Sequence, residues 1–194
     1  MEYPARSYSV LVVSASEKFN RSLSALLPET RYAPLVTVGD VASARRRILE
    51  DRYDIVMINT PLPDESGLRL ALDICDGSGS GVLLLVAAEH FPEVEARMAA
   101  YGVLTLSKPT TGQMIGQSLQ LLCGTRERLR RMEQKTASIE EKMEEIRLVN
   151  RAKWLLIEQL KMTEAQAHRY IEKQAMDRCV TRRSVAESIL ATYK

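Results

Sequence analysis

Short apolar runs alternate with helical patterns along the first 122 residues of the chain. Five of these runs have the length of buried strands, at residues 8–14, 35–38, 54–59, 82–88 and 103–107. Between and after them, apolar residues recur at helical spacing, and five helices are expected, the last beginning at Thr110. Strands that are apolar on both faces and separated by helices form parallel sheets. The pattern predicts an α/β fold with a doubly wound, five-stranded parallel sheet over residues 8–122.

A heptad stripe of mostly apolar residues follows this region. Steps of seven from Leu122 and from Met132 reach Leu129, Thr136, Met143, Asn150, Ile139 and Ile146. Charged residues of both signs fill the positions between them, as on the outside of a coiled coil. We expect a coiled-coil helix over residues 123–150 that pairs two copies of the chain in parallel. A solvated helix that folds back on the preceding domain is the alternative.

After Asn150 the apolar face widens, which predicts a small three-helix bundle. Thr163 and Gln166 have the spacing of a capping box that begins a second helix, and Thr181 can cap a third. The residues expected to face inward are Trp154, Leu155, Ile157, Leu160, Ala167, Tyr170, Ile171, Ala175, Val185, Ala186, Ile189 and Leu190.

Charge is distributed unevenly along the chain. Residues 147–194 hold ten Lys and Arg against five Asp and Glu, whereas residues 1–125 hold 11 against 14. A basic C-terminal region joined to an acidic N-terminal region suggests a polyanionic partner for the former, and phosphate backbones are the commonest polyanion.

Several classes of protein are not supported by the sequence. No apolar run approaches the roughly 18 to 20 residues of a membrane span. Cys75, Cys123 and Cys179 are far apart, and His90 and His168 have no partner at ligand spacing, so we expect neither metal nor cofactor. No nucleophile–base set or phosphate-cradling glycine loop is present, which argues against an enzyme. The N-terminal MEYPARS lacks the features of a secretion signal, so a cytoplasmic protein is expected.

Residues 8–122 resemble the receiver domain of two-component response regulators. The resemblance rests on the order of the elements, on DIVMINTPLPDESG at 54–67, and on Ser107-Lys108-Pro109 after the fifth strand. In that family an aspartate at the end of the third strand accepts a phosphoryl group, and an acidic pair after the first strand holds Mg²⁺. A Thr or Ser ends the fourth strand, and a Lys precedes a cis-proline.

Most of these positions have lost their chemistry in this chain. The phosphoacceptor position is Asn59, the acidic pair is Ser14-Ala15, and the hydroxyl position is Val86, so only Lys108 remains. Asp54 and Asp64 could substitute as acceptors, but Asp54 should lie at the wrong end of its strand and Asp64 in a turn. The resemblance therefore implies a pseudo-receiver that is not phosphorylated.

Residues 135–191, which include a lead-in helix, resemble the ANTAR domain of transcription antiterminators. The residues that carry the resemblance are Arg151-Ala152-Lys153, 162–167 (MTEAQA), Ala175-Met176 and Ser184-Val185-Ala186; Trp154 replaces a common glycine. The resemblance implies a regulator that, as a dimer, binds stem-loops of a nascent leader transcript and prevents formation of the terminator. A pseudo-receiver, a coiled coil and an ANTAR domain in this order are one architecture of the family.

Basic and aromatic side chains of this region suit RNA binding on physical grounds. The phosphate-binding candidates are Lys153, Arg169, Lys173, Arg178, Arg182 and Arg183, and Tyr170 or His168 can stack on exposed bases. Each has a structural alternative, such as a core position for Tyr170 or a solvated face for Arg169 and Lys173.

Two other functions remain open at this point. A small basic bundle can also enter a DNA major groove, as in a response-regulator-like transcription factor. The chain could also be a coiled-coil interaction protein without nucleic-acid binding. Because the receiver has no acceptor aspartate, the activity of the protein could be controlled by a regulatory protein partner, by a ligand or by the amount of protein.

Overall fold

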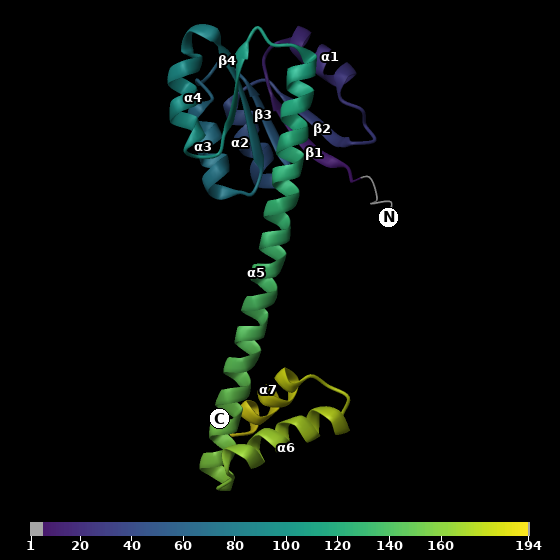
Figure 1. Ribbon diagram of the computed structural model, residues 1–194, viewed down its shortest axis with the longest axis vertical. Coiled ribbons are helices and arrows are strands. Elements are labelled where there is room, and N and C mark those ends of the chain that lie inside the picture. Colours follow the sequence, from purple (N-terminus) through teal and green to yellow (C-terminus); the bar gives the residue numbers. More distant parts are fainter. Residues whose placement is uncertain (1–5, 194) are drawn as a thin grey trace. The chain divides into compact units, whose positions relative to one another are not determined.

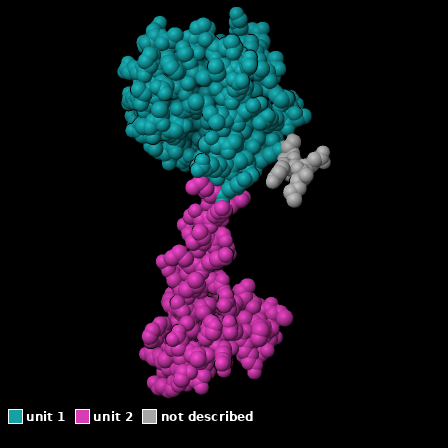
Figure 2. All heavy atoms as spheres, viewed as in Figure 1, with its two compact units in different colours: residues 1–131 teal, residues 132–194 magenta. Residues whose placement is uncertain are grey.

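A computed structural model describes residues 6–193 and divides the chain into two compact units, 1–131 and 132–194 (Figure 2). The expectation drawn from the N-terminal MEYPARS falls mostly on residues 1–5, and the last of the C-terminal cations is Lys194; both lie outside the described residues. No helix in the described part is long and apolar enough to cross a membrane. The two units are described separately.

The first unit contains the predicted parallel sheet (Figure 1). Its strands are β1 (Tyr8–Val13), β2 (Tyr32–Val38), β3 (Ile55–Asn59), β4 (Gly81–Ala87) and β5 (Leu104–Lys108). All neighbours pair in parallel, in the order β2-β1-β3-β4-β5. The predicted fold class is confirmed. In this order β1 and β3 are neighbours, so the ends of both strands approach one another at the carboxyl edge of the sheet.

Helices cover both faces of the sheet. One face packs against α2 (Val41–Glu50), α3 (Leu68–Gly77) and α4 (Phe91–Ala99), which follows the short 3₁₀ helix η1 (Ala88–His90). The other face packs against α1 (Glu17–Leu26) and the beginning of α5 (Gly112–Leu160). Successive residues of each central strand belong alternately to the two cores, which explains why the strands are continuously apolar.

Local sequence signals set the helix boundaries. Asp40 caps α2 by accepting a hydrogen bond from the Ser43 amide at 2.6 Å, as its position predicted. Helix α5 begins at Gly112 rather than at Thr110, because the Thr111 hydroxyl accepts from the Met114 amide at 3.2 Å. Gly67 precedes α3 with a φ of +77°, and a Cβ there would lie 2.9 Å from Ile58.

The second unit is a three-helix bundle made by the end of α5, α6 (Glu164–Asp177) and α7 (Arg182–Thr192). Thr163 and Gln166 form the predicted capping box, and Thr181 caps α7. The buried core is small and contains Ala152, Leu156, Ala167, Ile171, Ala175, Val185, Ala186 and Ile189.

Two residues predicted to face this core, Trp154 and Leu160, are instead exposed, and so is Tyr170, for which a core position and a stacking role were both open. Trp154, Leu160 and Tyr170 expose 70%, 45% and 38% of their surface. Helix α5 meets the bundle through Ala152 and Leu156, and a residue two positions from each lies about 200° away around the helix. Trp154 therefore faces away from the core that its apolar character suggested.

The predicted heptad stripe lies on α5, which is one continuous helix from Gly112 to Leu160. Leu122 is buried in the first unit's core, whereas Leu129, Met132, Ile139, Met143 and Ile146 are 41–59% exposed. The division at 131/132 falls inside the expected coiled-coil segment. Pairing of two chains, and the domain limits 8–122, 123–150 and 135–191, stay predictions.

Candidate functional site: a degenerate acceptor pocket and a basic surface

The carboxyl edge of the sheet, where receivers carry their phosphoacceptor, is called the acceptor end here. At this end, uncharged side chains and one lysine are joined by hydrogen bonds. Asn59 ends β3 and is buried, and its Nδ2 donates to the Ser14 Oγ at 3.0 Å. The Lys108 ammonium, at the end of β5, donates to the Asn59 Oδ1 at 3.0 Å and also to the Thr60 carbonyl. The topology thus brings together Ser14, Asn59 and Lys108, as the predicted receiver pocket requires.

This pocket lacks the groups that phosphoryl transfer uses. Asn59 presents an amide rather than a carboxylate, and Ala15 contributes no ligand. Val86 is buried, opposite Ser107 in the sheet. No cluster of His, Cys, Asp and Glu that could hold a metal occurs among the described residues. Burial lowers the pKa of Lys108 below its ordinary value, because the ammonium is partly removed from water. The Lys108–Pro109 peptide bond is cis, as in the family pattern.

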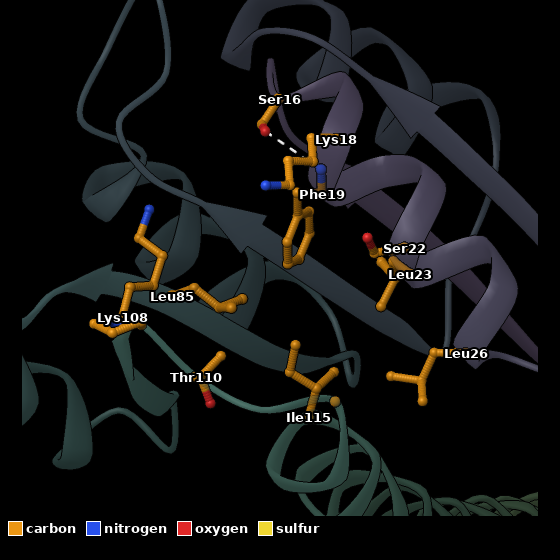
Figure 3. A pocket seen from close by; sticks show the side chains of 12 residues that line it. Ser16, Lys18, Phe19, Ser22, Leu23, Leu26, Leu85, Lys108, Thr110 and Ile115 are labelled. Carbon is orange, nitrogen blue, oxygen red and sulfur yellow. Dashed lines mark hydrogen bonds between the residues drawn. The ribbon is translucent and has the colours of Figure 1, made fainter.

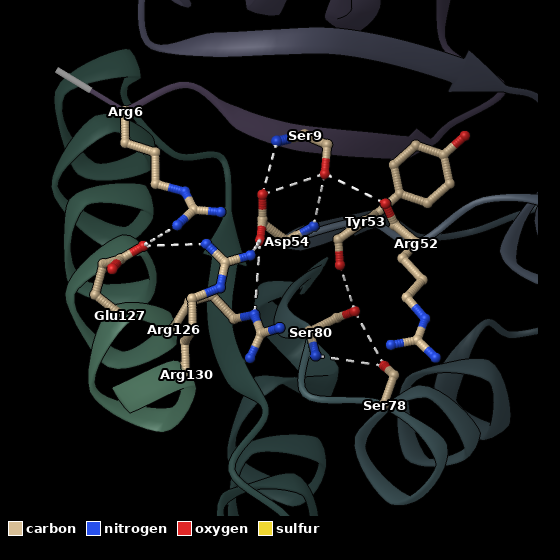
Figure 4. Close-up of polar contacts among 10 residues, drawn as sticks. All are labelled: Arg6, Ser9, Arg52, Tyr53, Asp54, Ser78, Ser80, Arg126, Glu127 and Arg130. Carbon is tan, nitrogen blue, oxygen red and sulfur yellow. Dashed lines mark hydrogen bonds and ion pairs between the residues drawn. The ribbon is translucent and has the colours of Figure 1, made fainter. Parts of the chain in front are cut away.

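The two aspartates that could substitute as acceptors are engaged elsewhere. Asp54 lies just before β3, at the opposite end from Asn59, and accepts from the Ser9 amide at 3.1 Å (Figure 4). Its other oxygen is 3.6 Å from both Arg126 and Arg130 on α5. Asp64 accepts from the Val41 and Ala42 amides at 3.0 Å, at the start of α2. These backbone hydrogen bonds lower the pKa of Asp64.

Three of the predicted RNA-binding cations form ion pairs within the second unit. Lys153 is 3.1 Å from Glu164, and only 16% of its side chain is exposed. Arg182 is 3.4 Å from Glu145. Arg183 is 2.9 Å from Glu187, and this hydrogen bond raises the pKa of the guanidinium. Their charges are therefore partly neutralised by neighbouring carboxylates.

The other three cations are exposed on α6 and at its end. Arg169, Lys173 and Arg178 have no ion pair within residues 6–193. Arg169 and Lys173 are one turn apart and lie opposite the buried Ala167 and Ile171. Tyr170 is also exposed, whereas the His168 ring lies 3.2 Å from Glu172.

Sequence reasoning missed Trp154 as a candidate binding residue. It is exposed, and Arg151, one turn before it on α5, is also exposed. The signal was present in the sequence, because Ala152 and Leu156 define a helix face that excludes residue 154. The prediction placed Trp154 in the core because its side chain is large and apolar, although its position on the helix indicates the opposite face.

Comparison with solved structures identifies the fold of the first unit. An adenylate cyclase structure from Rhodopirellula baltica matches with a TM-score of 0.62 and 16% identity, covering 68% of this chain and 98% of that one. The signal receiver domain of an HD domain-containing protein from Pseudomonas fluorescens Pf-5 matches with a TM-score of 0.59 and 21% identity, covering 68% and 97%. At these identities the likeness shows the fold alone.

Comparison of sequences addresses the second unit. Residues 137–190 match the model of the ANTAR domain. The chain carries an ANTAR domain C-terminal to a unit with the receiver fold. The transcriptional regulatory protein PdtaR of Mycobacterium tuberculosis (strain H37Rv) is 27% identical over 183 residues, which cover 94% of this chain and 89% of PdtaR. The predicted combination of an ANTAR domain and a receiver-like domain is confirmed.

Proposed function

We propose that this ANTAR protein is a cytoplasmic, RNA-binding transcription antitermination regulator. As a homodimer it binds stem-loops of a nascent leader transcript and prevents the terminator hairpin from forming. The ANTAR match to residues 137–190 and the likeness to a transcriptional regulatory protein support this function. The observation that carries the proposal is the set of exposed cations on the same unit that have no ion pair within residues 6–193.

Arg169, Lys173 and Arg178 form the primary phosphate-binding set in this proposal. Because they have no ion pair in the described chain, they can contact phosphates without separating from a carboxylate. Arg182 and Arg183 would first have to leave Glu145 and Glu187. Each phosphate contact releases condensed counterions, so binding should weaken as salt rises. Lys153 has a positioning role through Glu164.

Exposed aromatic rings supply the contacts to unpaired loop bases. Tyr170 lies between Arg169 and Ile171 on α6 and is 38% exposed. Trp154 on α5 is 70% exposed. Stem-loops present splayed bases that stack on aromatic side chains, whereas an intact duplex does not. Tyr170, next to Arg169 on α6, therefore favours hairpin RNA over duplex DNA, and Trp154 offers a second stacking surface on α5.

The exposed stripe of α5 is the proposed dimer contact. Met132, Ile139, Met143 and Ile146 recur at heptad spacing on a helix segment that has no core of its own in the single chain. Pairing with a second copy would remove this apolar surface from water, and the mixed charges around it suit a coiled coil. Two ANTAR units in one dimer can hold two stem-loops.

Gel-shift titration with hairpin RNA from the leader of a co-transcribed gene tests RNA binding. The R169E/K173E/R178E variant should lose at least about tenfold in affinity, and its salt dependence should become shallower. A matched control, R46E/R69E/R97E, changes three exposed cations of the first unit and should bind as the unaltered protein does. Preferential competition by duplex DNA would instead support a DNA-binding factor.

Sedimentation velocity tests the dimer. The I139D/M143D variant places charges on the proposed seam and should be monomeric, while E141K changes an exposed position on the outer side of the helix and should leave the dimer intact. A protein that is dimeric yet does not bind hairpin RNA even in low salt would support the interaction-protein alternative.

A further inference from the structure

Two neighbouring cavities open at the acceptor end of the receiver sheet. The larger, of about 520 Å³, lies between α1, β4 and the start of α5, and the smaller, of about 450 Å³, lies over Asn59. Ser16, Phe19 and Lys108 line both cavities. Volumes of this size accept small organic ligands. The two cavities together form what we term the acceptor-end pocket.

The pocket has an apolar end and a cationic end. Phe19, Leu23, Leu26, Leu85 and Ile115 line the larger cavity. In Figure 3 the Phe19 ring lies between the Lys108 side chain on one side and Leu23 and Leu26 on the other. The site is therefore polarised along its length, as a site for an amphipathic molecule should be.

The lining contains cations but no acidic side chain among the described residues. Lys108 and Lys18 line the larger cavity, and neither cavity is lined by Asp or Glu. At the receiver positions that carry carboxylates, this chain has Ser14, Ala15 and Asn59. The partly buried ammonium of Lys108 has no ion pair in the described chain. A charge withdrawn from water without a counterion is unfavourable, so an anion that enters the pocket would be stabilised.

The number of free donors indicates the kind of anion. An ammonium has three N–H groups, and Lys108 uses two of them for Asn59 and Thr60. One donor remains, which suits a carboxylate oxygen. A phosphate dianion is usually bound by several donors, by arginine or by a metal, and the pocket provides no such set.

We propose that the acceptor-end pocket binds a small amphipathic carboxylic acid, with its carboxylate at Lys108 and its apolar body between Phe19, Leu26 and Ile115. The ligand would contact Gly112 and Ile115 in the first turns of α5. This site would take a non-covalent ligand where other receivers take a phosphoryl group. The inference does not depend on RNA binding.

Methyl NMR of the full-length chain, labelled at Ile and Leu, tests the proposal with decanoate as the probe. Saturable shifts are expected at Leu23, Leu26, Leu85 and Ile115. Decanol lacks the carboxylate and should bind at least about tenfold more weakly, the difference of one charged hydrogen bond. Inorganic phosphate lacks the apolar chain and should also bind at least about tenfold more weakly, because it buries no apolar surface against Phe19, Leu26 and Ile115. Shifts spread over the exposed Leu49 and Leu129 would overturn the proposal, because they indicate unspecific adsorption.

Two variants that act on different parts of the pocket distinguish loss of the site from loss of the fold. K108M removes the charge and should weaken decanoate binding about tenfold without affecting decanol. S22W should fill the cavity and abolish binding of both, while Lys108 is retained. R46M is the control for loss of a surface cation and should bind decanoate unchanged. Unaltered decanoate affinity in a folded K108M protein, or the absence of saturable shifts in the unaltered chain, would reject the site.

Discussion

The two ends of strand β3 have opposite charge arrangements. At its start, Asp54 has two arginines of α5 and two donors from Ser9 around it, and only 13% of its side chain is exposed. At its end, Asn59 stands where receivers have the acceptor aspartate, and Lys108 forms no ion pair with a carboxylate in the described chain. One end is a carboxylate surrounded by cations, and the other is a cation whose expected carboxylates are missing.

The two ends of β3 therefore have different roles: the start contributes to stability, and the end forms the receiver pocket. The Asp54 cluster ties β1 and β3 to α5, so its charges contribute to the fold of the first unit (Figure 4). At the other end of β3, Ser14, Asn59 and Lys108 are joined by hydrogen bonds, no carboxylate lines the cavity over Asn59, and residues 6–193 contain no metal-binding cluster. The receiver fold is therefore retained here, although the amide of Asn59 stands at the phosphoacceptor position.

The largest expected effect is on the Asp54 end. D54A should lower the free energy of unfolding of the first unit by about 3 kcal/mol, because it removes the partly buried carboxylate that Arg126 and Arg130 share and that accepts from Ser9. D73A is the matched control, since Asp73 lies only 2.7 Å from Arg45 but 43% of its side chain is exposed. It should cost at most about 1 kcal/mol.

Urea denaturation followed by far-UV circular dichroism measures both variants. Adding R126M and R130M to D54A should recover part of the lost stability, because these partly buried cations no longer have the Asp54 carboxylate beside them. Equal losses for D54A and D73A would show that burial does not distinguish the two ion pairs.

A smaller effect is expected at the other end of β3. N59A removes one acceptor and one donor, so Ser14 and Lys108 each lose a partner. We expect the free energy of unfolding to fall by about 1 to 2 kcal/mol, since the lost hydrogen bonds lie at a partly buried site. Urea denaturation of N59A and D54A under the same conditions compares how much each end of β3 contributes to the free energy of unfolding. A larger loss for N59A than for D54A would reverse the comparison.

Asp64, in the loop after β3, should give a weaker and pH-dependent effect. Hydrogen bonds from Val41 and Ala42 lower the pKa of this carboxylate in the folded protein below the ordinary 3.8. Its stabilisation is therefore present above that value and is lost as pH falls through the lowered folded pKa. D64N should be less stable than the unaltered chain at neutral pH, and the difference should vanish in acid. A constant difference across pH would exclude this linkage.

No effect at all is expected from phosphodonors. Acetyl phosphate with Mg²⁺ should leave the intact mass and the oligomeric state unchanged, because Asn59 is not a competent nucleophile and the pocket offers no carboxylate to Mg²⁺. Mass spectrometry of the intact chain is the measurement. A gain of one phosphate would mean that Asp54, Asp64 or another residue serves as acceptor.

The sheet and its connections could be predicted from the sequence because they depend on local patterns. The apolar strands, the Asp40 cap and the Thr163–Gln166 capping box each fixed an element near its observed boundary. The degenerate acceptor pocket could also be predicted, because the positions in the motif map directly onto strand ends. These features require no knowledge of which helix faces meet.

Features that depend on tertiary packing were not predicted. Trp154 is exposed, although its apolar character suggested the core, because Ala152 and Leu156 make the contacts of α5 with the bundle. The ion pairs of Lys153, Arg182 and Arg183 join residues that are distant in the sequence or depend on side-chain conformation. These ion pairs determine which cations are available to bind phosphate, and a count of charged residues in the sequence cannot reveal them.

The exposure of Trp154 also has an optical consequence. It is the single tryptophan of the chain, and its indole is mostly in contact with water already in the folded monomer. Unfolding of the receiver body should hardly alter its fluorescence, whereas any macromolecule that covers this face of the bundle should quench the emission or move it to shorter wavelength. The chain thus carries its own reporter of occupancy, and it requires no label.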